Sequence, residues 1–375
     1  MEHSLDLTYH WAGFSALVVF VIAYAFVMAE EFTHLRKSKP VVLAAGLIWG
    51  MIAIAYSNTP HYEMVEHEIR HSFLEYTELA FFLLVAMTYI NALEERNVFN
   101  SLKSWLIKNQ FSYRQLFWIT GVLAFFLSPL ADNLTTALVL CAVVVAVGSS
   151  SPKFVGLACV NIVVAANAGG AFSPFGDITT LMVWQAGQLD FLQFFALVVP
   201  SVVNYIIPAS IMHFFVSDHK PDVAETSVAI KYGGKTIILL GLLTIVTAVS
   251  FHNFLHLPPV FGMMTGLAYL QLYSFYIKIN VRDIEEQKYD FFENVARVEW
   301  DTLFFFFGVI LSVGGLGFIG YLEYVSEFMY TDLGATTANV LVGILSAIVD
   351  NIPVMFAVLT MEPAMPDSQW LLVTL

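Results

Sequence analysis

The feature that most constrains this chain is the recurrence of apolar runs about as long as a bilayer is thick. A helix needs about 20 residues to cross the hydrocarbon core. Regular runs of about this length occupy roughly 11–29, 40–57, 77–93, 191–216, 235–252, 258–277 and 300–319, and less regular apolar stretches cover 113–149, 152–186, 335–361 and 370–375. With 58% hydrophobic and 12% charged residues, the sequence predicts an all-α polytopic membrane protein.

The net charge of the chain restricts which kinds of molecule it can bind. A formal net charge of −14 argues against nucleic acid and favours small cations, in addition to the lipid bilayer itself. Cys141 and Cys159 both lie inside apolar segments, so neither a disulfide framework nor a metal cluster is predicted.

The positions of the basic residues predict the topology, because loops rich in Lys and Arg stay cytoplasmic. If the N-terminus lies outside and the segment 113–149 enters and leaves from the cytoplasmic face, 15 of the 16 Lys and Arg residues fall inside. We therefore expect 113–149 to be a hairpin that turns near Asp132. By the same reasoning, 335–361 is a hairpin that enters from the outer face.

The two hairpins carry a repeated motif. "FLSPLADNLTTALVL" (126–140) and "ILSAIVDNIPVMFAVL" (344–359) share Ser-x-x-x-Asp-Asn at a shift of 218 residues. Two copies of opposite orientation indicate an inverted repeat, as in many secondary transporters. The predicted organisation is 1–57, N-terminal spans; 58–216, the first repeat; 217–299, a linker with two spans; and 300–375, the second repeat.

The segment 152–186 is predicted to be a broken helix. Its part "NAGGAFSPFGDITTLMVW" (167–184) is interrupted by three glycines and a proline and carries several polar side chains. Unwound backbone at membrane depth is tolerated only where protein or a watery cavity surrounds it. The freed carbonyls and neighbouring side chains offer the hard oxygen ligands that a small cation requires.

These three motifs resemble the NhaD-type sodium/proton antiporters of the ion transporter superfamily. The resemblance implies a bacterial inner-membrane exchanger that expels Na⁺ or Li⁺ for incoming H⁺ and requires no cofactor. It also implies a transport domain of two re-entrant hairpins and two broken helices, and a possible homodimer. The mirror of the first broken helix would fall near position 385, beyond Leu375, so we expect the second repeat to lack its C-terminal part in this chain.

The expected mechanism is competition of H⁺ and Na⁺ for carboxylates in the membrane. A charged aspartate there costs about 2.5–3.5 kcal/mol on translocon scales, which argues against a merely structural role. We expect Na⁺ at Asp132, Asn133, Asn167 and Asp177. The wider predicted ion and proton site adds Ser128, Thr135, Ser173, Thr179 and Thr180, with Ser346, Asp350 and Asn351 in the second half.

Several alternatives remain open from the sequence. Sodium-coupled uptake of a dicarboxylate is the first, since relatives with that activity share the architecture. A membrane zinc protease is a distant second, because "HEIRH" would make His67 and His71 ligands and Glu68 the base. Glu78 and Asp301, at the starts of corresponding spans, are interpreted either as a proton relay or as interfacial caps.

Overall fold

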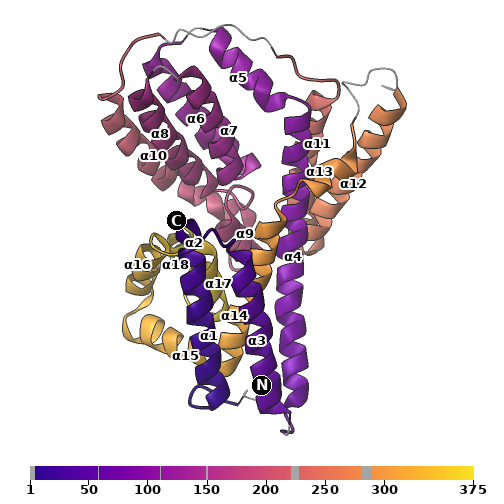
Figure 1. Ribbon diagram of the computed structural model, residues 1–375, viewed down its shortest axis with the longest axis vertical. Coiled ribbons are helices and arrows are strands. Elements are labelled where there is room, and N and C mark those ends of the chain that lie inside the picture. The colour runs from indigo at the N-terminus through magenta and orange to yellow at the C-terminus, as the bar shows by residue number, and fades with distance from the viewer. Residues whose placement is uncertain (1–4, 58, 110, 149–150, 221–227, 281–288) are drawn as a thin grey trace. The chain divides into compact units, whose positions relative to one another are not determined.

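The computed structural model describes residues 5–57, 59–109, 111–148, 151–220, 228–280 and 289–375 (Figure 1). Helices dominate these residues, and no strand occurs among them. Within them, nine helices are long and apolar enough to cross a membrane. Their bounds are Trp11–Met28, Ser38–Tyr56, Tyr62–Glu95, Tyr113–Ala131, Pro152–Gly170, Phe191–His213, Gly234–Leu255, Pro259–Ile279 and Trp300–Ile319. The predicted all-α polytopic class is confirmed.

The chain folds into two compact units, 1–83 with 299–375 and 84–298. The first of these units combines the two ends of the chain, whereas the prediction divided the chain into four consecutive segments. The four segments stay predictions. The inverted repeat and the entry of the hairpins from opposite faces also stay predictions. Part of the predicted linker, 221–227 and 281–288, lies outside the described residues.

The first unit is built around α14 (Trp300–Ile319), which is the most buried of the long helices, with 72% of an 18-residue stretch of it inside the protein. α1 (Trp11–Met28), α3 (Ser38–Tyr56) and α17 (Asn351–Thr360) all pack on it. The unit also holds α2 (Glu30–Thr33), the first part of α4 (Tyr62–Glu95), α15 (Tyr321–Ser326), a π-helical segment (Glu327–Asp332), α16 (Ala335–Ser346) and α18 (Asp367–Thr374).

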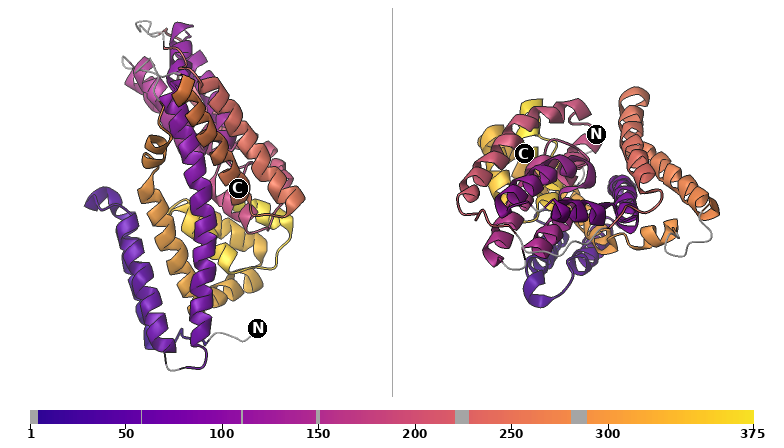
Figure 2. Two further views of the ribbon diagram at one scale, coloured as in Figure 1. Left: turned by 90° about the vertical axis from the view of Figure 1, so that its right-hand side faces the viewer. Right: turned by 90° about the horizontal axis from the view of Figure 1, so that it is seen from above.

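The second unit has a bundle formed by α6 (Tyr113–Ala131), α7 (Asn133–Val147), α8 (Pro152–Gly170) and α10 (Val198–His213). α8 packs on the other three. α11 (Gly234–Leu255) pairs with α12 (Pro259–Asn280), and the two run side by side in Figure 2. The remaining elements are α5 (Val98–Lys108), α9 (Ile178–Gln185), a 3₁₀ helix (Phe191–Leu197) and α13 (Phe291–Ala296).

Two predicted elements have different extents in the structure. The span expected at 77–93 belongs to α4, a single 34-residue helix that also contains the charged segment before it. The segment 191–216 begins as a 3₁₀ helix and becomes α10 only at Val198. Charged residues do not end a helix by themselves, because Glu, Lys and Arg have good helix propensity and lie on an exposed face.

Candidate functional site

The first hairpin is interrupted at a single residue, Asp132. Its backbone has φ 54° and ψ 161°, between the end of α6 at Ala131 and the start of α7 at Asn133. Pro129, inside the last turn of α6, weakens the helix just before this point because it lacks an N–H donor. The turn therefore lies where the sequence predicts it.

Asp132 caps α7 with its carboxylate. Oδ1 accepts a hydrogen bond from the backbone N of Thr135 at 2.7 Å, and Oδ2 accepts one from Thr135 Oγ1 at 2.9 Å. An acidic N-cap is stabilised by the free N–H groups and the positive end of the helix dipole. The fold thus holds both carboxyl oxygens of Asp132 at the tip of the hairpin.

The broken helix repeats this arrangement. α8 ends at Gly170, and α9 starts at Ile178 with Asp177 as its N-cap. Oδ1 of Asp177 accepts hydrogen bonds from the backbone N and the Oγ1 of Thr179, at 3.0 and 2.9 Å. Both predicted interruptions therefore end on an aspartate that starts the next helix.

Glycine allows the two breaks to meet. A Cβ on Gly176 would lie 2.6 Å from Gly170 Cα and 3.0 Å from Pro129 Cα, so any larger residue would clash with backbone. The contact is closed by hydrogen bonds from Asn133 N to Gly176 O at 3.1 Å and from Ser173 Oγ to Pro129 O at 3.0 Å. The unwound segment is thereby fixed against the hairpin tip.

The amide of Asn133 joins the polar groups of the two breaks. Its Nδ2 donates to Asn167 Oδ1 at 3.0 Å and to Asp177 Oδ2 at 2.9 Å. Asp132, directly before Asn133, and Asp177 are half-buried, and Asn167 is exposed, so none of these side chains is sealed inside the protein. The structure therefore brings together the four residues at which Na⁺ is predicted.

Three predicted hydroxyls hold the frame of this cluster. Ser128 Oγ donates to Ala166 O at 2.6 Å, and Thr180 Oγ1 donates to Ser173 O at 3.0 Å, in addition to the bond of Ser173 described above. All three residues are buried. Their hydroxyls donate to main-chain carbonyls of the hairpin and of the broken helix, and so tie these segments together.

The second hairpin differs from the first. Asp350 caps α17, accepting from Ile352 N at 3.3 Å, and its Oδ2 forms an ion pair with Lys37 Nζ at 3.2 Å. Ser346 Oγ donates to Gly343 O within its own helix, and Asn351 is exposed. The repeated motif therefore has the same capping aspartate in both hairpins, with different surroundings.

The remaining sequence candidates lie in the first unit. Asp301 Oδ1 accepts a hydrogen bond from Ser38 Oγ at 2.5 Å, and Glu78 is half-buried on α4. Of the "HEIRH" motif, His71 Nδ1 lies 3.9 Å from Glu75 Oε1. Within the described ranges, no group of three or more His, Cys, Asp or Glu side chains is arranged to hold a metal ion.

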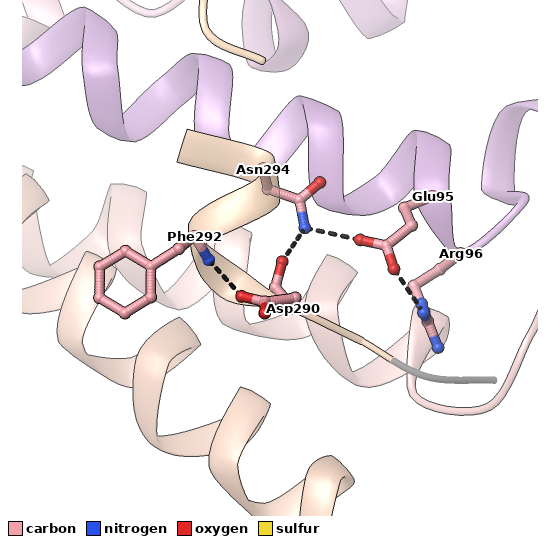
Figure 3. Close-up of polar contacts among 5 residues, drawn as sticks. All are labelled: Glu95, Arg96, Asp290, Phe292 and Asn294. Carbon is pink, nitrogen blue, oxygen red and sulfur yellow. Dashed lines mark hydrogen bonds and ion pairs between the residues drawn. The ribbon is translucent and has the colours of Figure 1, made fainter. Parts of the chain in front are cut away.

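A second polar network, which the sequence does not single out, lies at the end of α4 (Figure 3). Glu95 accepts a hydrogen bond from Asn294 Nδ2 at 2.6 Å and forms an ion pair with Arg96 at 2.8 Å. Arg96 is fully buried, and its guanidinium lies 4.9 Å from the ring centre of Tyr289. Asn294 also donates to the backbone O of Asp290. The network attaches α13 to α4.

The first site is a set of hard oxygen donors on two interrupted helices. Carboxylate and amide oxygens suit a small hard cation, and two carboxylates supply the charge that compensates for its lost water. Sequence reasoning selected these residues, but it missed that the aspartates are helix caps. The local signal was available, since Asp132 and Asp177 each stand directly before an apolar run and shortly after a helix breaker, Pro129 or Gly176, which is the usual place of an N-cap.

The fold and this site define a polytopic transporter with a carboxylate site between broken helices. The sequence profile of the citrate transporter family (CitMHS) matches residues 11–375. The chain belongs to this family, and to the NhaD group within it, since it is 53% identical to the Na⁺/H⁺ antiporter NhaD of Vibrio cholerae, over 99% of this chain and 82% of that relative.

Two further relatives illustrate the range of similarity. The Na⁺/H⁺ antiporter NhaD of Alkalimonas amylolytica is 52% identical over 99% of this chain and 81% of its own length. Sodium/proton antiporter 1 of Arabidopsis thaliana is 31% identical over 92% of this chain and 59% of its own length. The chain is a multi-pass membrane protein and a transporter, not an enzyme.

Proposed function

We propose that the chain is a Na⁺/H⁺ antiporter that moves Na⁺ or Li⁺ in one direction and H⁺ in the other. The observation that carries this is the Asn133 amide, which joins Asn167 and Asp177 directly beside Asp132. The printed names of the NhaD relatives describe the same exchange. Sodium-coupled dicarboxylate uptake is not favoured, because two carboxylates in the site would repel an anion.

The exchange follows from the charge of the two carboxylates. A half-buried carboxylate is stabilised either by a proton, which neutralises it, or by a bound Na⁺. The site can move across the membrane when it holds Na⁺ or when it is protonated, but not when it is empty and charged. Under this condition each Na⁺ that leaves the cell is exchanged for H⁺. Asn133, Asn167, Thr135 and Thr179 then position the carboxylates and supply neutral oxygens.

The cellular setting belongs to the same proposal. The bacterial NhaD relatives and the placement of Lys and Arg support a bacterial inner-membrane location with the N-terminus outside. In this setting the inward proton gradient drives Na⁺ out of the cell, which contributes to pH homeostasis. A homodimer rests on the family resemblance alone.

The test is Na⁺-induced dequenching of a pH-sensitive dye in everted membrane vesicles. Asp132→Asn and Asp177→Asn are expected to lower the signal by at least tenfold, since each removes a charge that balances the ion. Asp190→Asn is the matched control, because Asp190 caps the 3₁₀ helix, is exposed, and is expected to leave exchange intact. Full exchange by both site variants, or Na⁺-dependent succinate uptake, would contradict the proposal.

A further inference from the structure

The carboxylate of the second hairpin lies against an ammonium group from a distant part of the chain. Lys37 Nζ is 3.2 Å from Asp350 Oδ2, although the residues are 313 positions apart. The two side chains are only 29% and 24% exposed, so water and salt screen their attraction less than at an open surface. The pair is a defined feature of the first unit.

α14 holds Lys37 in place through two contacts, one with Lys37 itself and one with the next residue. The next residue, Ser38, donates its hydroxyl to Asp301 Oδ1, and one turn further along α14 the ring of Phe305 lies 4.2 Å from Lys37 Nζ. Asp301 and Phe305 are four residues apart and therefore share a face of the helix. An ammonium over an aromatic face is attracted to it, so the lysine is held beside Asp350 by more than the carboxylate alone.

Both oxygens of Asp350 have partners in this arrangement. Oδ1 accepts from Ile352 N as the cap of α17, and Oδ2 faces Lys37. A Na⁺ at this carboxylate would have to displace the ammonium, which carries the same single charge. One carboxylate compensates one positive charge, so Lys37 and Na⁺ are alternatives at Asp350.

We propose that Lys37 is a built-in cation that occupies the second hairpin, so that Asp350 takes up no Na⁺ and only the first site binds the transported ion. Lys37 is thus a residue that determines how many Na⁺ ions one chain binds. This inference rests on the proposed function, since it assumes a Na⁺ site at Asp132 and Asp177. It assigns the two copies of the Ser-x-x-x-Asp-Asn motif different roles.

The test counts ²²Na⁺ bound per chain by the purified full chain at pH 8.5. The unmodified protein is expected to bind one Na⁺. Lys37→Gln leaves Asp350 without its partner, and an uncompensated half-buried charge requires another cation, so binding is expected to rise to two per chain with a Hill coefficient above 1. Lys37→Gln combined with Asp350→Asn is expected to return the count to one.

Three controls keep the result interpretable. Lys37→Arg retains the charge, and Lys39→Gln removes an exposed neighbouring charge, so both are expected to bind one Na⁺. If Lys37→Gln does not fold, Asp350→Asn decides instead, and it is expected to bind one Na⁺ still. A folded Lys37→Gln that binds one Na⁺, or an Asp350→Asn that binds none, overturns the inference. An unmodified protein that binds no Na⁺ overturns the proposed function as well.

Discussion

Asn133 donates its side-chain amide to Asp177 Oδ2 at 2.9 Å across a separation of 44 residues, from the tip of the first hairpin to the start of α9 in the broken helix. The same nitrogen donates to Asn167 Oδ1. One amide therefore sets the distance between a carboxylate and a neutral oxygen, and in the proposed ion site this distance would determine the size of the ion that fits.

Replacing this amide is expected to weaken ion binding. Asn133→Ala removes a hydrogen bond to a charged group, worth about 1.5–3 kcal/mol, so the half-saturating Na⁺ concentration should rise by roughly tenfold to a hundredfold. Dye dequenching at graded Na⁺ concentrations measures this. Asn109→Ala is the control, because its amide donates to Trp105 O at the end of α5. Equal half-saturation in both variants would contradict the assigned role.

The contact between the two breaks should not tolerate a methyl group. Gly176→Ala places a Cβ against the backbone of Gly170 and Pro129, and overpacking of this kind costs about 1–3 kcal/mol. Exchange is expected to fall by at least tenfold in vesicles that contain equal amounts of protein. Gly156→Ala in α8 has open space around its Cβ and should exchange normally. Normal exchange by Gly176→Ala would show that the close approach is not required.

The network at the end of α4 should contribute to stability. Asn294 is 1% exposed, and Asn294→Ala leaves Glu95 with one hydrogen-bond donor fewer, at a cost of about 1–3 kcal/mol. Thermal unfolding in detergent is expected to shift down by roughly 2–8 °C. Glu293→Ala changes an exposed position of the same short helix and should shift it far less. Identical shifts of the melting temperature in the two variants would mean that the buried Asn294 amide does not contribute to stability.

Stability at alkaline pH should depend on Tyr330. Burial raises the pKa of its hydroxyl to about 12, and the hydroxyl lies 3.2 Å from Asn339 Oδ1. Between pH 10 and 12 the unfolded chain releases this proton while the folded chain keeps it, so stability falls as pH rises. The loss of melting temperature over this range should therefore be smaller in Tyr330→Phe.

The control for the alkaline experiment is Tyr9→Phe, at a tyrosine that is 91% exposed. This variant should lose melting temperature between pH 10 and 12 as steeply as the unmodified protein. If Tyr330→Phe shows the same slope as Tyr9→Phe, the buried hydroxyl does not account for the alkaline loss.

Much of this protein was determined by local sequence. The apolar runs set the long helices, and Pro129 and the glycines of 169–176 set the interruptions. The repeated motif and the broken-helix segment supplied the candidate residues of the first site. These features depend on neighbours within one or two turns, so they are readable along the chain. The length of α4 could not be read in this way. Helix propensity extends through the charged residues before the apolar run, and a search for apolar residues leaves these out.

Only the tertiary structure decided how distant groups combine. The repeated motif placed Asp132 in the main predicted ion site and Asp350 in its second half. In the structure Asp132 lies beside the Asn133 amide that reaches Asn167 and Asp177, whereas Asp350 pairs with Lys37. The partners are separated by 34, 44 and 313 residues. Such pairs form because helix packing brings their ends together, and neither hydrophobic periodicity nor a short motif specifies which ends will meet.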